Sequence, residues 1–141
     1  MKKTKQILFL SILLIFSTYS YAQSILDSSN DTIAIIDNNL IFNMEGDTIG
    51  EFLTNGEVKD KLTQNTIGYI EENYFRNTEN ILIGYLDEQN NVKDINGNHI
   101  GKIHNQTIVY DLNDMVIGKS SSGIASTKLA AYFFFFFSKD M

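Results

Sequence analysis

Apolar and polar positions follow a repeating order along most of this chain. Each repeat contains an apolar residue, then Asn or Asp, then a polar pair, and it closes on the dipeptide Ile-Gly. Successive glycines are separated by 68 − 50 = 18, 84 − 68 = 16, 101 − 84 = 17 and 118 − 101 = 17 residues. Such a regular period predicts a structure built from one repeated unit. The five dipeptides are Ile49-Gly50, Ile67-Gly68, Ile83-Gly84, Ile100-Gly101 and Ile117-Gly118.

A polar pair stands four and five residues before each of these glycines. Asn-Gly and related pairs accept positive φ, which the tight turns of two-residue hairpins require. We therefore predict that each repeat of about 17 residues is a β-hairpin with its turn at the pair. The pairs are Glu45-Gly46, Thr63-Gln64, Glu79-Asn80, Asn96-Gly97 and Asn113-Asp114.

The stretch "NNVKDINGNHIGKI" illustrates the expected strands. Val92 would face inward, and Ile100 and Ile103 would follow the turn three residues apart. A regular strand returns to one face every second residue, so Gly101 between them predicts a β-bulge. The second repeat departs from the pattern, because Asp60 stands eight residues before its glycine and the other repeats have seven. This difference predicts a bulge or a longer turn there.

A glycine at one place in every hairpin also indicates close approach of backbones around a common axis. A lone hairpin is marginal in stability, whereas several hairpins around an axis give each one a partner on both sides. Five tandem hairpins, followed by small residues and a phenylalanine run, resemble the bacterial family of five-fold β-flower proteins, over about Ile33 to Phe137. The resemblance implies an all-β fold with a pseudo-five-fold axis and an exported location. It implies no catalytic residues.

The end of the repeats, "IASTKLAAYFFFFF", predicts a short hydrophobic helix or strand, with Ser126 or Thr127 as the cap if it is a helix. A segment that is apolar on every side must be surrounded. We expect it to pack against the hairpins as a plug or lid. An exposed tail for adhesion or self-association is the alternative. The residues expected to close the core are Phe133, Phe134, Phe135, Phe136 and Phe137.

The N-terminus carries the features of a secretory signal peptide. Lys2, Lys3 and Lys5 precede an apolar stretch at 7–16, and small residues follow up to Ala22. We predict cleavage after Ala22 and a periplasmic, extracellular or cell-surface location. The mature chain would be one domain, 23–141, with hairpins over about 38–123 and the aromatic segment at 124–141. Its stability must come from packing, because the chain has no cysteine.

Charge narrows the range of partners. The chain carries a formal net charge of −6, and loss of three lysines with the signal peptide would give 8 − 17 = −9. So acidic a chain repels phosphate backbones, and nucleic acid is not expected as a partner. Leu129 to Phe137 is nine residues long, and a spanning helix needs about twenty, so no transmembrane span is expected in the mature chain.

Residues that carry chemistry are few. His99 and His104 are the two histidines, and their odd spacing places them on opposite faces of a regular strand, so we expect no shared metal and no cofactor. The pairs Glu71-Glu72 and Asp87-Glu88 fall between repeats, where a solvated loop is the default. A catalytic acid pair needs burial or a partner, which nothing here indicates. We therefore expect no enzyme.

The residues after the Ile-Gly glycines should form one outward ring. Ordinary sheet surface is the favoured interpretation, and binding of a carbohydrate or a protein ligand is the other. We thus expect a structural or binding module of the cell envelope. An adhesin or membrane-associated protein that uses the phenylalanine run, and an envelope hydrolase, are the alternatives. The ring residues are Glu51, Tyr69, Tyr85, Lys102 and Lys119.

Overall fold

The structure is a computed structural model that describes residues 22–137. The signal peptide predicted for 1–22 and the last four residues of the chain lie outside this range, apart from Ala22. The elements are β1 (Gln23–Asp27), β2 (Thr32–Asp37), β3 (Leu40–Phe42), β4 (Thr48–Phe52), β5 (Glu57–Asp60), β6 (Asn65–Glu71), β7 (Tyr74–Arg76), β8 (Leu82–Leu86), β9 (Asn91–Asp94), β10 (His99–His104), β11 (Ile108–Asp111), β12 (Val116–Ser120), α1 (Ser126–Ala130) and the π-helix η1 (Ala131–Phe136).

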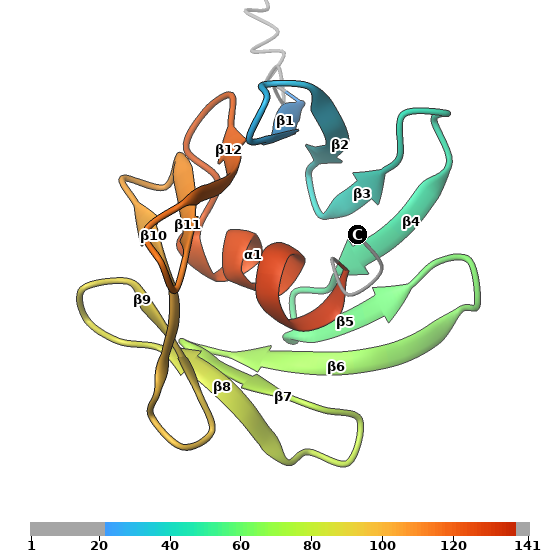
Figure 1. The fold of residues 1–141 in the computed structure, drawn as a ribbon. Helices are drawn as coiled ribbons and strands as arrows, with labels where there is room; N and C mark the ends of the chain where they lie inside the picture. Colours follow the sequence, from blue (N-terminus) through green and yellow to red (C-terminus); the bar gives the residue numbers. More distant parts are fainter. Residues whose placement is uncertain (1–21, 138–141) are drawn as a thin grey trace, which may run out of the picture.

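The strands form a closed antiparallel barrel. Each strand pairs with the strands before and after it in the chain, and β1 pairs with β12 to close the ring. Figure 1 shows the ring of strands with the C-terminal helix in its middle. The predicted all-β fold of hairpins around an axis is confirmed, and the C-terminal segment, expected as a helix or a strand, is a short helix. No helix among the described residues is long and apolar enough to span a membrane.

The barrel contains one hairpin more than the five Ile-Gly dipeptides. Strands β1 and β2 form this additional hairpin. Its sequence follows the same pattern, with Ile33-Ala34 in place of Ile-Gly, and its spacing of 50 − 34 = 16 residues matches the others. A search for Ile-Gly dipeptides does not find this copy, because Ala34 replaces the glycine. Six hairpins therefore complete the ring, of which five carry the glycine.

The hairpin tips differ from the two-residue turns predicted from the polar pairs. In the β3–β4 hairpin, Asn43 N donates to Asp47 O at 2.9 Å and Gly46 N donates to Asn43 O at 3.2 Å, so three residues form the loop. The side-chain Oδ1 of Asn43 accepts from the N–H groups of Glu45 and Asp47. This Asx cap holds the turn, and only the last loop residue needs positive φ (88° at Gly46).

The predicted bulges exist, but they lie one residue earlier than expected. In the β9–β10 hairpin, His99 pairs with Lys93 and Gly101 pairs with Val92, which leaves Ile100 as the extra residue. Gly101 and Ile103 therefore share the buried face, whereas Ile100 is half-buried. The same shift falls at the residue before the glycine or Ala34 in all six hairpins, namely Ile33, Ile49, Ile67, Ile83, Ile100 and Ile117.

The extra residue of the second repeat lengthens its turn. Asp60 pairs with Asn65, so the loop contains four residues, at 61–64. The carboxylate of Asp60 accepts from the N–H groups of Leu62 and Thr63. The pairs that follow are in register again, with Val58 opposite Gly68. The longer turn thus absorbs the insertion without moving the glycine from the inner face.

The C-terminal segment is helical and begins without a side-chain cap. Ala125 occupies the N-cap position, and its carbonyl accepts from Lys128 N and Leu129 N. The expected cap at Ser126 or Thr127 is therefore wrong, because the N-cap lies one residue before Ser126 and two before Thr127. After one α-helical turn the helix widens into η1. Tyr132 stacks on Phe137 with ring centroids 6.0 Å apart, as an i→i+5 helix allows.

Candidate functional site

The repeat glycines and the phenylalanines meet inside the barrel, one ring to one glycine. A Cβ added to Gly118 would lie 2.1 Å from Phe133 Cζ. Along the helix the contacts then proceed around the barrel in reverse chain order, as Phe134 with Gly101, Phe135 with Gly84, Phe136 with Gly68 and Phe137 with Gly50. Opposite each glycine on the neighbouring strand stands a residue with no exposure, namely Ile41, Val58, Phe75, Val92 and Val109.

This matching explains both the glycines and the wide helix. An α-helix advances about 100° per residue, which is too far to direct successive side chains at neighbouring hairpins. The wider i→i+5 helix advances less per residue, so that successive rings can reach successive hairpins. The Phe75 ring stacks on Phe135 with centroids 4.3 Å apart. Phe133 and Phe135 belong to the buried core, and Phe134, Phe136 and Phe137 are partly buried against it.

The outward ring predicted after the glycines does not form one site. Glu51 accepts a 2.9 Å hydrogen bond from Lys61, and Lys119 donates to Asn30 at 2.5 Å. Tyr85 faces Tyr74 across the sheet, with centroids 6.1 Å apart. Lys102 lines a small depression of about 190 Å³ with His104, Tyr110 and Asp114. Tyr69 is the ring residue that lines the larger pocket described below.

The two histidines lie at opposite ends of β10, and both are exposed. No group of three or more His, Cys, Asp or Glu residues that could hold a metal ion occurs within residues 22–137. Loop residues of the serine stretch at 121–123 are exposed as well. Gln23 and Ser24 fasten this stretch to β1, through bonds to Gly123 O and Ser121 Oγ.

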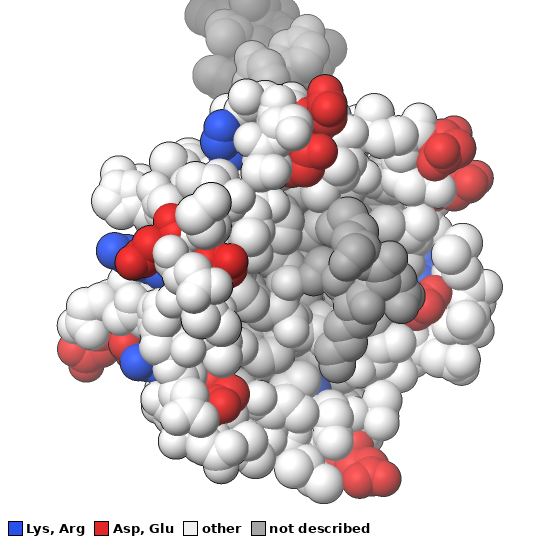
Figure 2. Space-filling view, viewed as in Figure 1, with Lys and Arg blue, Asp and Glu red and all other residues white. Residues whose placement is uncertain are grey.

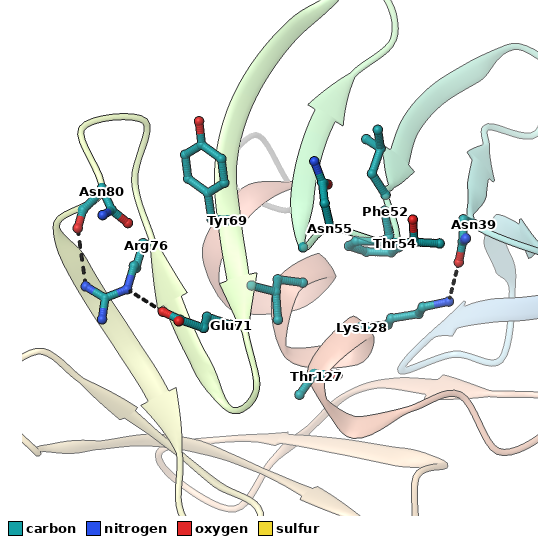
Figure 3. Close-up of a pocket in the computed structure, with 13 residues that line it drawn as sticks. Asn39, Phe52, Thr54, Asn55, Tyr69, Glu71, Arg76, Asn80, Thr127 and Lys128 are labelled. Atoms are coloured by element: carbon teal, nitrogen blue, oxygen red, sulfur yellow. Dashed lines mark hydrogen bonds and ion pairs between the residues drawn. The ribbon is translucent and has the colours of Figure 1, made fainter.

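A pocket of about 550 Å³ opens where the β4–β5 loop meets the ends of β6 and β7 and the start of α1. This volume is in the range of small-molecule sites. Figure 3 shows side chains from these separate segments around one space. Its lining consists of Asn39, Phe52, Leu53, Thr54, Asn55, Gly56, Tyr69, Ile70, Glu71, Arg76, Asn80, Thr127 and Lys128.

The backbone at Gly56 shapes the rim of this pocket. Gly56 has φ of 88°, and its carbonyl accepts a 2.7 Å hydrogen bond from Ile70 N. A Cβ at this position would lie 2.2 Å from Ile70 O. Glycine therefore lets the loop at 53–56 lie directly against β6, which brings Asn55 close to the strand that carries Tyr69.

Lys128 forms one wall. Its Nζ donates to Asn39 Oδ1 at 3.0 Å and to Asn38 O at 3.4 Å, and it lies 5.7 Å from the centroid of the Phe52 ring. Burial lowers the pKa of the Lys128 ammonium. The ion pairs formed within residues 22–137 do not include it. The wall thus presents a half-buried cation held by neutral oxygens and an aromatic face.

Arg76, Glu71 and Tyr69 form the other wall. Arg76 Nε lies 3.4 Å from Glu71 Oε2, and another guanidinium nitrogen donates to Asn80 O at 3.2 Å. Tyr69 stands directly opposite Arg76 in the β6–β7 register. In Figure 3, Tyr69 lies between the Arg76 cluster and the Lys128 wall. The guanidinium is therefore already engaged, whereas Tyr69 offers a ring face and a hydroxyl.

The pocket is equipped for binding. It offers amides, hydroxyls, two cations, the aromatic rings of Tyr69 and Phe52, and a single carboxylate that is paired with Arg76. The lining includes no histidine or cysteine, and its hydroxyl groups have no neighbouring base of the kind that activates a nucleophile. Convergent polar groups beside an aromatic ring are typical of sites for polar organic molecules.

Sequence reasoning proposed one residue of this site for binding, Tyr69, through its place after a glycine, and it named Glu71 only as a solvated loop acid and Thr127 only as a possible helix cap. Arg76, Asn55 and Lys128 come from separate segments, and no spacing in the sequence relates them. Lys128 was visible only as a charge beside the apolar segment. Asn55-Gly56 is the one further signal, because it is a turn dipeptide between repeats.

A family model described as "5-fold beta-flower protein" matches residues 22–138 of this chain. The match covers all twelve strands and both helices, and it agrees with the resemblance drawn from the repeats. No curated protein and no solved structure matches the chain.

Proposed function

Since this chain belongs to the 5-fold beta-flower protein family, which is not a known enzyme family, we propose that it is an exported binding module of the bacterial cell envelope. The module binds a carbohydrate in the pocket beside Tyr69. The observation that carries this proposal is the convergence of an aromatic ring, amides and cations on one space of about 550 Å³.

A carbohydrate fits this pocket better than an extended peptide. Peptides commonly bind sheet proteins by adding a strand to a free edge. Within residues 22–137 each strand of the barrel already has two neighbours, so that mode has no edge to use. A sugar instead needs a flat apolar face and several hydrogen-bonding groups, which Tyr69, Asn55 and Asn80 can supply.

Two features support export. The sequence places a basic segment, an apolar segment and small residues in the order of a signal peptide. Strand β1 begins at Gln23, the residue after the predicted cleavage point. Expression of the whole chain in a bacterium with a secretory system, followed by N-terminal sequencing, tests this. Export predicts a mature start at Gln23, and recovery of uncleaved protein from the cytoplasm would contradict it.

Binding is tested by titrating the chain from Gln23 to Met141 with short gluco-, chito- and galacturono-oligosaccharides while following ¹⁵N–¹H spectra. We expect saturable shifts at Asn55, Tyr69 and Lys128. Tyr69→Ala should weaken binding at least tenfold, whereas Tyr85→Ala, the matched change at an equivalent position outside the pocket, should not. Absence of binding by every sugar, or equal effects of the two substitutions, would refute the proposal.

A further inference from the structure

Within residues 22–137, the charge at the Lys128 wall has no acidic partner. The ammonium is half-buried, and its hydrogen bonds go to the neutral oxygens Asn39 Oδ1 and Asn38 O. Removing a charge from water is costly unless an opposite charge or strong hydrogen bonds replace the water. This site therefore favours a ligand that brings a negative group to Lys128.

The pocket also differs in charge from the rest of the molecule. Its lining holds Arg76, Lys128 and Glu71, which sum to +1 at neutral pH, whereas the whole chain carries −6. Figure 2 shows acidic side chains spread around the perimeter of the face drawn, with the basic ones few and scattered. An acidic ligand is repelled by most of the surface and attracted to this pocket.

We propose that the carbohydrate is an acidic one, whose carboxylate binds Lys128 while a neighbouring sugar ring lies against Tyr69. This inference rests on the proposed function and names its ligand class. The structure prepares a second contact for the carboxylate. Because Oδ1 of Asn39 accepts from Lys128, its amide Nδ2 faces away from Lys128, and Nδ2 donates no hydrogen bond within residues 22–137. An oxygen of the carboxylate can accept from it.

A carboxylate suits this site better than a phosphate monoester. Lys128 supplies one positive charge, which balances one carboxylate. The guanidinium of Arg76 already contacts Glu71 and Asn80 O, and the Glu71 carboxylate offsets its positive charge. A phosphate would bring up to two charges near the carboxylate of Glu71. The balance of charges therefore selects a singly charged acid.

The competing explanation is that Lys128 only fastens the helix to the turn at 38–39. Both explanations predict some loss of stability when Lys128 is replaced. They differ in ligand preference, because a fastening residue cannot distinguish an acidic sugar from its neutral ester.

The experiment compares matched pairs of sugars by calorimetric titration of the chain from Gln23 to Met141. The pairs are trigalacturonate, triglucuronate and an N-acetylneuraminate dimer, each beside its methyl ester. We expect the acid to bind at least tenfold more tightly than its ester in one or more pairs. Raising the salt concentration should reduce this preference, because the Lys128 wall is partly open to solvent.

Variants assign the preference to Lys128. Lys128→Met keeps the apolar stem and should reduce the preference for the acid over its ester to less than twofold. Lys128→Arg keeps the charge and should retain the preference, and it serves as the reference if the Met variant is unstable. Lys102→Met removes a cation outside the pocket and should change nothing.

The outcomes separate the two proposals. Equal binding of acid and ester, or a preference that survives in Lys128→Met, would overturn the acidic ligand and leave the carbohydrate pocket standing. Binding by neither member of any pair, together with no binding by the neutral gluco- and chito-oligosaccharides, would refute both.

Discussion

Replacing Gly118 with alanine tests whether the rings and the glycines fit together as the barrel interior indicates. The new Cβ would lie 2.1, 2.4 and 2.9 Å from three carbons of the Phe133 ring, whereas carbon atoms in contact prefer about 3.5–4.0 Å. The Phe133 side chain is only 7% exposed, so it is enclosed by its neighbours on nearly every side. Overpacking of this kind costs about 1–3 kcal/mol.

Gly118→Ala should change the free energy of unfolding in opposite directions with and without the Phe133 ring. Without the ring, alanine should be better than glycine in a strand by about 0.5–1 kcal/mol. Gly118→Ala should therefore destabilise the protein in the parent but stabilise it slightly in a Phe133→Ala background, which removes the three nearest contacts of the new Cβ. The coupling free energy between the two positions should be about 2 kcal/mol.

Urea unfolding followed by circular dichroism measures these free energies, with the slope checked for constancy. Phe133→Ala alone should cost about 3–5 kcal/mol, and Phe133→Leu is the milder background if that variant does not fold. Gly123→Ala is the control, because its Cβ would approach only Gln106, at 3.3 Å. A Gly118→Ala variant as stable as its parent, or one that loses as much stability without the Phe133 ring, would show that the ring does not require the glycine.

Three further outcomes are expected from the same measurements. Ala34→Gly should lower the free energy of unfolding by about 1–2 kcal/mol, because it removes a buried methyl group and places a more flexible residue in a strand. A gain in stability would contradict this. Hydrogen bonds from Asn98 lower the pKa of Asp94 below 3.8. The ionised carboxylate of Asp94 therefore stabilises the fold above pH 3.8, and this stabilisation is lost as the pH falls through the folded pKa. Asp94→Asn should keep the turn, as Asn43 and Asn77 do, and reduce the loss of stability below about pH 4. Burial raises the pKa of Tyr132 above 10.0, so folding weakens as the pH rises above 10.0, and Tyr132→Phe should reduce that alkaline loss when both chains are unfolded at pH 9 and pH 11.

The repeat itself was open to prediction because each hairpin is specified locally. An Asx residue, a polar pair and an Ile-Gly dipeptide recur at nearly constant spacing, and turn chemistry needs nothing beyond the neighbouring residues. The additional hairpin was missed because Ala34 replaces the glycine. The loop length was predicted wrongly because an Asx cap and a positive φ at one residue have the same sequence signature as a two-residue turn.

The candidate site was far less predictable. Tyr69 was noticed through its place in the repeat, but Lys128, Asn39 and Asn55 belong to different segments, which the closed barrel brings together. Hydrogen bonds such as that between Lys128 and Asn39 join residues 89 positions apart. No local pattern records a contact of that range.

By itself, the sequence determined that this protein consists of tandem hairpins, because turns and strand alternation depend on interactions between near neighbours. It also contained five repeat glycines and a run of five phenylalanines without showing why these two numbers agree. Only the tertiary structure decided that each ring occupies the space above one glycine, and that a pocket forms where the helix meets the barrel. Both depend on closure of the barrel around the helix, which brings distant segments within van der Waals contact.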